Sequence, residues 1–140
     1  AIASTQAAFS LSEVRLGLIP SVISPYVIAA IGEREARRYF LTAERFDAVE
    51  ARRIGLVHDV VDSGALDEAV AKIAGQLLKG GPQALAAAKK LIADVSRRSM
   101  DDALSAETAR RIAAIRVESE GREGLAAFFE KRSPAWTKRN

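Results

Sequence analysis

The spacing of apolar residues changes along the chain. Residues 1 to 14, A-I-A-S-T-Q-A-A-F-S-L-S-E-V, contain short apolar segments without a helical period, and we expect one or two short strands there. Residues 56 to 61, L-V-H-D-V-V, are rich in β-branched residues and predict another strand. Elsewhere apolar residues recur at the three- and four-residue spacing of amphipathic helices. The pattern predicts a βα region followed by a helical one.

Turn and capping residues set the limits of the first helices. Pro20 interrupts the segment before it, and Ser24-Pro25 offers an N-cap followed by a proline at the first helical position. The helix that starts there is expected to stop at Gly32. A second helix is predicted from about residue 34 to residue 43, and its buried side is formed by Tyr39, Phe40 and Ala43.

Capping-box spacing marks the third helix. Asp47 and Glu50 are three residues apart, so each can satisfy a backbone N–H at the other's position, and the helix is expected to end at Gly55. His58 lies in the apolar run that follows. Because no partner motif surrounds this histidine, a structural role is favoured over a catalytic one.

Four more helices are predicted after residue 65. The first ends at Gly80-Gly81, the second begins at Pro82, the third is capped by Ser99, and the fourth runs from about residue 122 to 131. The apolar faces of four helices are more than is needed to bury one small strand. The surplus apolar surface indicates a partner, either another subunit or the rest of a domain. The expected apolar positions are Leu66, Val70, Ile73, Leu77; Leu85, Ala88, Ile92, Val95; Leu104, Thr108, Ile112, Ile115; and Leu125 with Phe128 or Phe129.

The tail from Ser133 to Asn140 is predicted to be extended, with Trp136 as its packing anchor rather than a ligand-stacking residue. The chain begins with Ala1-Ile-Ala-Ser-Thr5, which resembles the end of a buried strand and is expected to start in the middle of a domain.

Composition narrows the classes of function. The 140 residues contain no cysteine and one histidine, which disfavours a thiolate or multi-histidine metal site and a Ser-His-Asp triad, so no metal is expected. The net charge is +3, but basic and acidic residues alternate, so nucleic acid is disfavoured as a partner. No apolar run approaches a membrane span, and a cytoplasmic location is expected.

Glu13 is the candidate for acid/base chemistry. It lies in the mostly apolar segment F-S-L-S-E-V-R-L-G-L-I-P, residues 9 to 20, directly before a Gly/Pro turn. A carboxyl group buried in such a segment can exchange protons near neutral pH. The alternatives are that Glu13 points to solvent or pairs with Arg15.

Four segments together resemble the crotonase (enoyl-CoA hydratase/isomerase) superfamily. The first is residues 9–20 above, and the second is A-I-G-E-R-E-A-R-R-Y-F-L-T-A-E-R-F-D-A-V-E-A-R-R-I-G-L-V-H-D-V-V. The third is G-P-Q-A-L-A-A-A-K-K-L-I, and the fourth is E-G-R-E-G-L-A-A-F-F-E-K-R-S-P-A-W. In this order they cover essentially the whole chain and are similar to the C-terminal half of a family subunit. The sequence L-G-L-I-P-S-V-I-S-P-Y-V-I-A-A-I-G-E-R, residues 16–34, looks most like that of bacterial methylglutaconyl-CoA hydratase-type members.

The resemblance implies an α/β fold in two parts. Residues 1–64 would be the incomplete C-terminal part of a spiral of ββα turns, and residues 65–140 a mainly helical oligomerisation and CoA-capping region. The implied assembly is a homo-trimer or a dimer of trimers. The implied activity is that of a hydro-lyase of fatty-acid or branched-chain amino-acid metabolism, adding water reversibly to an α,β-unsaturated acyl-CoA thioester. No cofactor is implied, because coenzyme A is part of the substrate.

The resemblance also assigns site residues. Glu13 matches the second of the family's two acid/base glutamates, while Phe128 and Lys131 match positions that contact the adenosine end of CoA. For Phe128 ordinary core packing, and for Lys131 a solvated charge at a helix C-terminus, are equally good explanations. The family's oxyanion and first-glutamate segments lie upstream of the matched region, so the fragment is expected to be inactive alone.

Two departures leave the substrate open. The family's frequent P-G-x-G-G-T turn is replaced by Pro20-Ser-Val-Ile-Ser-Pro-Tyr26, which reshapes the floor of the pocket, and Ser12 stands where proline is frequent. Other crotonase activities such as enoyl-CoA isomerisation share the scaffold. From outside the family, a non-catalytic helical oligomerisation module is the alternative.

Overall fold

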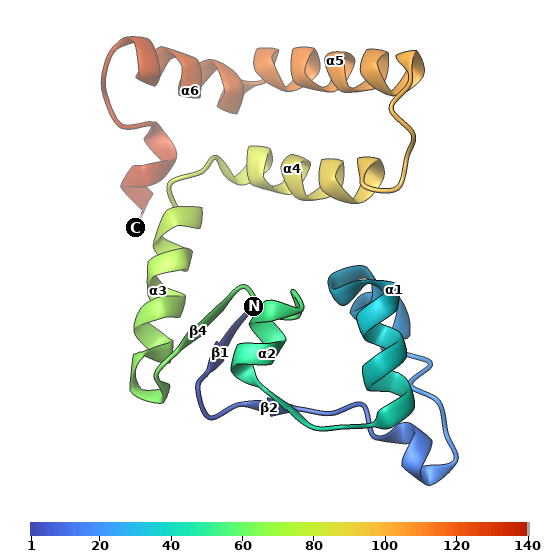
Figure 1. Ribbon diagram of the computed structural model, residues 1–140. Coiled ribbons are helices and arrows are strands. Elements are labelled where there is room, and N and C mark those ends of the chain that lie inside the picture. The colour runs from blue at the N-terminus through green and yellow to red at the C-terminus, as the bar shows by residue number, and fades with distance from the viewer. Residues whose placement is uncertain (140) are drawn as a thin grey trace. The chain divides into compact units, whose positions relative to one another are not determined.

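The computed structural model describes residues 1–139 and divides the chain into two compact units. Unit 1 is Ala1–Lys72 and unit 2 begins at Ile73 (Figure 1). The division falls inside helix α3, whereas the family resemblance implied a boundary at residue 64. The roles predicted for the two parts stay predictions.

Unit 1 contains two small sheets. Strand β1 (Ile2–Ser4) pairs in parallel with β4 (Asp59–Val61), with Ala3 opposite Val60. Strand β2 (Ala8–Phe9) pairs antiparallel with β3 (Phe46–Asp47). The strands predicted at both ends of this unit are confirmed, although β4 is shorter than the apolar run that predicted it, because residues 56–58 lie in the turn that precedes it.

The helices of unit 1 begin and end close to the predicted residues. A 3₁₀ turn, η1 (Glu13–Leu16), leads into α1 (Ser24–Thr42), which is interrupted at Gly32 by a positive φ of 75°. The N-cap of α1 is Ile23 rather than Ser24, and the Ser24 hydroxyl donates to the Ser21 carbonyl at 2.8 Å, so the predicted cap was one residue late.

Helix α2 (Ala48–Arg53) is capped as predicted at its start. The Asp47 side chain accepts from the Glu50 backbone N–H at 2.8 Å. Glu50 does not complete the box: its carboxylate accepts instead from the Tyr39 hydroxyl and the Arg53 guanidinium. The helix ends before Gly55, whose φ is 85°, as expected.

The core of unit 1 is built around Tyr39, the largest fully buried side chain among the described residues. Its ring lies 4.2 Å from that of Phe46, and Phe46 in turn stacks against Phe9 at 5.7 Å. This confirms the predicted buried side of the second half of α1, with Phe40 only partly buried. The other core residues are Ala3, Val27, Ile31, Ala36, Ala48, Ala51, Ile54 and Val57.

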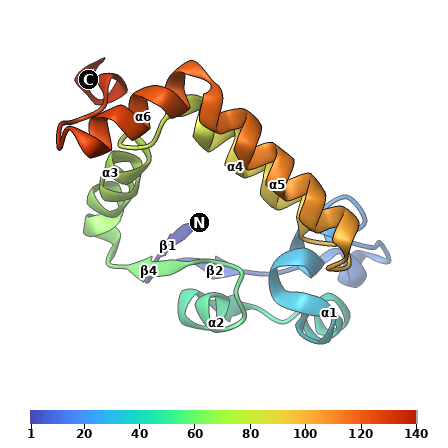
Figure 2. The same ribbon diagram turned by 90° about the horizontal axis from the view of Figure 1, so that it is seen from above.

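Unit 2 is helical in all its described elements. Helix α3 (Leu66–Leu77), which follows the short turn η2 (Ser63–Ala65), crosses the division between the units. It is followed by α4 (Pro82–Val95), α5 (Asp102–Val117), α6 (Ser119–Phe129) and the 3₁₀ turn η3 (Ala135–Arg139). Helices α4 and α5 run along each other in both views (Figure 1, Figure 2).

Three predictions about unit 2 were wrong. The N-cap of α5 is Asp101, whose side chain accepts from Leu104 N–H at 2.7 Å, and not Ser99. The tail forms η3 and is not extended, although Asn140 lies outside the described residues. The side chains of Leu125, Phe128 and Phe129 are exposed, and it is Ala127 that α6 buries.

Polar contacts join the elements of unit 2. The Glu120 carboxylate of α6 accepts from the N–H groups of Gln83 and Ala84 at the start of α4, at 3.1 and 2.8 Å. Arg111 of α5 pairs with Asp94 of α4 at 2.8 Å. The Trp136 indole N–H donates to the Lys79 carbonyl at 3.1 Å, so the predicted anchoring of the tail is confirmed.

Candidate active site

Glu13 is the first residue of η1, and a glycine completes this turn. Gly17 has a φ of 73° and its N–H donates to the Val14 carbonyl at 3.2 Å. The Leu18 N–H donates to the Glu13 carbonyl at 3.0 Å. Glycine adopts a positive φ without strain, so Gly17 allows the chain to close this turn directly after Glu13.

The Glu13 carboxyl group is half-buried and lacks a partner on one oxygen. Its Oε2 is the one buried side-chain polar atom without a hydrogen bond in the part of the chain that the structure describes. Neither alternative from the sequence holds for this atom: it is not in solvent, and Arg15 does not bind it. Burying an unpaired carboxylate oxygen costs free energy, and a ligand that supplies a proton or a donor there removes this cost.

Packing of the preceding strand holds the Glu13 segment. Phe9 lies four residues before Glu13 and stacks on Phe46, and the Ser10 hydroxyl donates to the Ala43 carbonyl at 3.4 Å. Phe46 rests on Tyr39, whose hydroxyl is bonded to Glu50. Hydrogen bonds from Arg53 and from Tyr39 lower the pKa of Glu50 to about 2, so it stays ionised, and burial raises the pKa of Tyr39. The segment is therefore fixed to the core of unit 1.

The turn after Glu13 presents apolar side chains to solvent. Pro20 is buried, but Ile19, Val22 and Tyr26 are each about three-quarters exposed or more, with values of 74, 89 and 76%. The turn that follows Glu13 in the chain therefore has an apolar surface.

The two other predicted site residues lie at the end of α6 in unit 2. Phe128 is 76% exposed and its ring meets that of Phe129 edge to face at 5.7 Å. Lys131 follows the helix with a φ of 54°, which is unusual for a residue with a side chain. The structure thus brings Phe128 and Lys131 together, whereas Glu13 belongs to the other unit.

A carboxylate that sequence reasoning missed lies beside this pair. Glu123 accepts from the Arg132 guanidinium through both oxygens, at 2.7 and 3.0 Å, and from the Ala135 N–H at 2.8 Å. These bonds, with that of Arg132 first, lower the pKa of Glu123 to about 2, and they raise the pKa of Arg132. Nothing in the local sequence pairs residues nine positions apart across a helix end, so only the fold reveals this contact.

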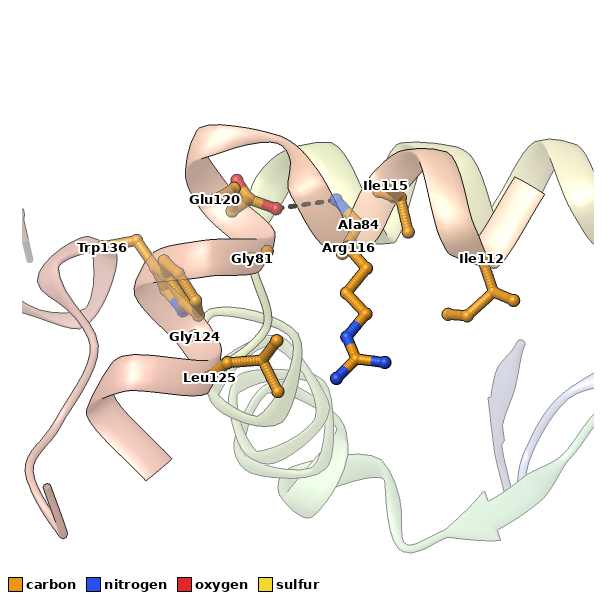
Figure 3. Close-up of a pocket in the computed structure, with 10 residues that line it drawn as sticks. Gly81, Ala84, Ile112, Ile115, Arg116, Glu120, Gly124, Leu125 and Trp136 are labelled. Atoms are coloured by element: carbon orange, nitrogen blue, oxygen red, sulfur yellow. Dashed lines mark hydrogen bonds between the residues drawn. The ribbon is translucent and has the colours of Figure 1, made fainter. Parts of the chain in front are cut away.

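The hollows of unit 2 do not contain a predicted site residue. One cavity of about 370 Å³ lies where α4, α5, α6 and Trp136 meet (Figure 3). Figure 3 shows Glu120 turned toward Ala84, so its carboxylate caps α4 and is not free for catalysis. A groove of about 670 Å³ between α4 and α5 is lined mainly by alanine, leucine and isoleucine, with Lys90, Thr108, Arg111 and Glu118 as its polar residues.

Among residues 1–139, no cluster of three or more histidine or acidic side chains is suited to a metal ion. Within the same residues, every helix is too short or too polar to cross a bilayer.

The fold defines the class of protein. The chain superposes on the crystal structure of an enoyl-CoA hydratase from Shewanella pealeana with a TM-score of 0.92 and 52% identity, over 97% of this chain and 51% of that one. The predicted crotonase-type α/β fold is therefore confirmed.

The family follows from the sequence comparisons. The model of the family described as enoyl-CoA hydratase/isomerase matches residues 1–139, and the chain belongs to this family, the crotonase superfamily. It is 33% identical to 2,3-dehydroadipyl-CoA hydratase of Escherichia coli over 137 residues, 95% of this chain and 52% of the relative. It is 34% identical to crotonyl-CoA hydratase of Syntrophomonas wolfei over 132 residues, 94% and 50% respectively. The chain thus spans about half the length of these curated relatives.

Proposed function

We propose that the chain is the C-terminal half of an enoyl-CoA hydratase-type hydro-lyase and that Glu13 is one of its two acid/base residues. The observation that carries the proposal is the buried, unpartnered Oε2 of Glu13 on a turn fixed to the core. The family includes both hydratases and isomerases, and the hydratase names of two relatives support hydration.

The proposed chemistry is the reversible addition of water across the α,β double bond of an acyl-CoA thioester. The oxygen of water bonds to the β-carbon, and the α-carbon receives a proton. Glu13 would deliver that proton in hydration and remove it in dehydration, since a positioned carboxyl group serves in both directions. The other glutamate, which handles the water, and the two N–H donors to the thioester oxygen would come from residues outside this chain.

The CoA end of the substrate would contact unit 2. Phe128 offers an exposed aromatic face to the adenine ring, and the Lys131 ammonium is a point charge suited to a phosphate. Both residues sit on the same helix end, which supports a joint role. Three further properties remain predictions. They are assembly as a homo-trimer or a dimer of trimers, the need for no cofactor beyond the CoA of the substrate, and a cytoplasmic location.

The acyl group is a separate question. We infer a branched or functionalised acyl chain, of the methylglutaconyl type, because the apolar Pro20-to-Tyr26 turn replaces the glycine turn beside Glu13. Comparing the kcat/KM of crotonyl-CoA and methylglutaconyl-CoA tests this inference. A preference for crotonyl-CoA contradicts it.

The experiment that tests the function uses the full-length enzyme. Loss of the enoyl thioester absorbance is followed for the wild type, for Glu13→Gln and for the control Glu33→Gln, an exposed carboxylate of α1 paired with Arg37. Glu13→Gln is expected to lower kcat by roughly 10²- to 10⁴-fold with little change in CoA-ester binding. The control keeps its rate. Normal turnover by Glu13→Gln contradicts the proposal, and so does turnover by the 140-residue chain alone.

The rival is a non-catalytic helical oligomerisation module. The exposed apolar faces of unit 2 favour assembly under either reading, so oligomeric state does not separate them. Binding of a CoA ester by the full-length protein does. A protein that assembles but binds no CoA ester is the module and not the enzyme.

A further inference from the structure

The chain reverses direction at the end of α6 through a Schellman motif, a pair of backbone hydrogen bonds that closes a helix. The Arg132 N–H donates to the Ala127 carbonyl at 3.0 Å, and the Lys131 N–H donates to the Phe128 carbonyl at 3.2 Å. In this motif the first of the two donor residues after the helix adopts a positive φ, and glycine is usual there. Here that residue is Lys131, with a φ of 54°.

A lysine in this conformation is strained, because its Cβ crowds the backbone where glycine has none. Such strain persists when the surrounding structure enforces it, and it accumulates at functional sites. The side chain of Lys131 is exposed. Burial in a core therefore does not account for a lysine at this position, whereas a role for the ammonium group does.

The enforcing contacts come from Arg132, the next residue. Its guanidinium forms a bidentate ion pair with the Glu123 carboxylate, and its Nε donates to the Glu130 carboxylate at 2.5 Å. Glu123 also accepts from the Ala135 N–H at 2.8 Å, which holds the chain after the turn. The chain that follows Lys131 is thus tied to α6 by a bidentate ion pair, which has a fixed geometry.

The same contacts determine the charge around Lys131. Arg132 occupies both nearby carboxylates, Glu123 and Glu130. Among the side chains that the structure describes, residues 1–138, no carboxylate forms an ion pair with Lys131. The Lys131 ammonium is left available to an external anion, and the backbone N–H of Lys131 is bonded to the carbonyl of Phe128, whose ring is exposed.

We propose that Glu123 and Arg132 are positioning residues that hold Phe128 and Lys131 in the arrangement that binds the nucleotide end of the CoA thioester. The inference rests on the proposed function, because it takes the anion to be a phosphate of CoA. Glu123 and Arg132 do not touch the substrate. They act by fixing the turn and by keeping the neighbouring carboxylates away from the lysine.

The test measures the binding of CoA to the full-length enzyme by titration calorimetry, with Glu123→Gln as the first variant. This substitution keeps the size of the side chain and an acceptor for Ala135 N–H, and it removes the charge that holds Arg132. We expect the Kd of CoA to rise about tenfold, the effect of losing one charge-assisted contact. The control Glu33→Gln makes the same substitution in a more exposed Arg–Glu pair of unit 1 and is expected to leave the Kd unchanged.

A truncated substrate separates positioning from general damage. The same acyl group is supplied as a thioester of CoA and of N-acetylcysteamine, which lacks the nucleotide. Glu123→Gln is expected to raise KM for the CoA thioester alone, with kcat preserved for both. Equal changes in KM for the two thioesters, or no change in either KM or Kd, overturn the inference.

Lys131→Gly keeps the test decisive if Glu123→Gln folds poorly. Glycine relieves the strain at φ 54° and removes the ammonium group, so this variant is expected to bind CoA more weakly while its melting temperature holds or rises. Unchanged CoA binding by Lys131→Gly overturns the inference. If the wild-type enzyme hydrates neither thioester, the proposed function is wrong. The calorimetric comparison of CoA binding by the wild type and Glu123→Gln still tests the role of Glu123 in that case.

Discussion

The two units of this chain are stabilised by different means. Unit 1 encloses a continuous apolar core around Tyr39, from β1 through α1 to α2. In unit 2, among the residues described, only Leu104 and Ala127 are buried apolar side chains. Carboxylates form many of its contacts: Glu120 joins α6 to α4, Asp94 joins α4 to Arg111 of α5, and Glu123 of α6 binds Arg132 in the turn that follows. Because unit 1 has an apolar core, it is suited to holding an acid/base group in place. Unit 2 has few buried apolar side chains, so its surface is suited to adapting to partners and ligands.

The core of unit 1 gives the largest expected effect. Tyr39→Ala removes a side chain that is 1% exposed and leaves a cavity, so we expect unit 1 to lose roughly 3–5 kcal/mol of its unfolding free energy. Leu104→Ala in unit 2 is expected to cost less, about 2 kcal/mol, because fewer neighbours surround that residue. Hydrogen exchange of peptides from each unit in urea measures both. An equal loss in the two units contradicts the comparison.

Acid is expected to act on unit 2 before unit 1. The pKa of Glu123 is about 2 in the fold, and hydrogen bonds from lysine and arginine also lower the pKa values of Asp94 and Glu107. A carboxylate with a lowered pKa stabilises the fold above its unfolded pKa, and this stabilisation is lost as pH falls through the folded value. Unit 1 also holds such a carboxylate, since the pKa of Glu50 is about 2, but its apolar core does not titrate. Between about pH 4.5 and pH 2, unit 2 is therefore expected to lose amide protection first. Hydrogen exchange across this range checks the order, and earlier loss in unit 1 contradicts it.

The Glu120 cap gives the smallest effect. Glu120→Ala leaves two N–H groups at the start of α4 without their acceptor, so we expect a loss of about 1 kcal/mol, close to that of losing an N-cap side chain. The change is expected to be confined to α4 and visible as faster exchange of its first amides. Arg122→Ala, an exposed position two residues further along α6, is the control. Faster exchange with the control as well would show that α6 itself, rather than the cap, was disturbed.

The difference between the units also explains what the sequence could predict. Local rules placed β1, the break at Gly32, the Asp47 cap and the end of α2 at Gly55, because each depends on a few neighbouring residues. They misplaced the Ser99 cap and the extended tail, and they assigned Phe128 or Phe129 to a core. In unit 2 the apolar period predicted helices correctly but not their burial, since burial depends on surfaces that do not lie in the local sequence.

For the candidate site too, local features could be predicted from the sequence and long-range contacts could not. Glu13 was found because its apolar surroundings and the glycine after η1 are local features, and its resemblance to a family motif supplied the role. The chain of contacts that holds it, from Phe9 through Phe46 and Tyr39, joins residues about thirty positions apart. The Glu123–Arg132 pair and the Glu120 cap likewise arise only once the helices have folded back on one another.

The most direct test of the central claim follows the α-carbon proton itself. The full-length enzyme is incubated with the saturated 3-hydroxyacyl-CoA in D₂O, and mass spectrometry records deuterium at the α-carbon. The account predicts rapid incorporation by the wild type and a rate lower by about a hundredfold or more in Glu13→Gln, with CoA-ester binding retained. Incorporation at the wild-type rate by Glu13→Gln would contradict the assignment of Glu13 as the residue that moves this proton.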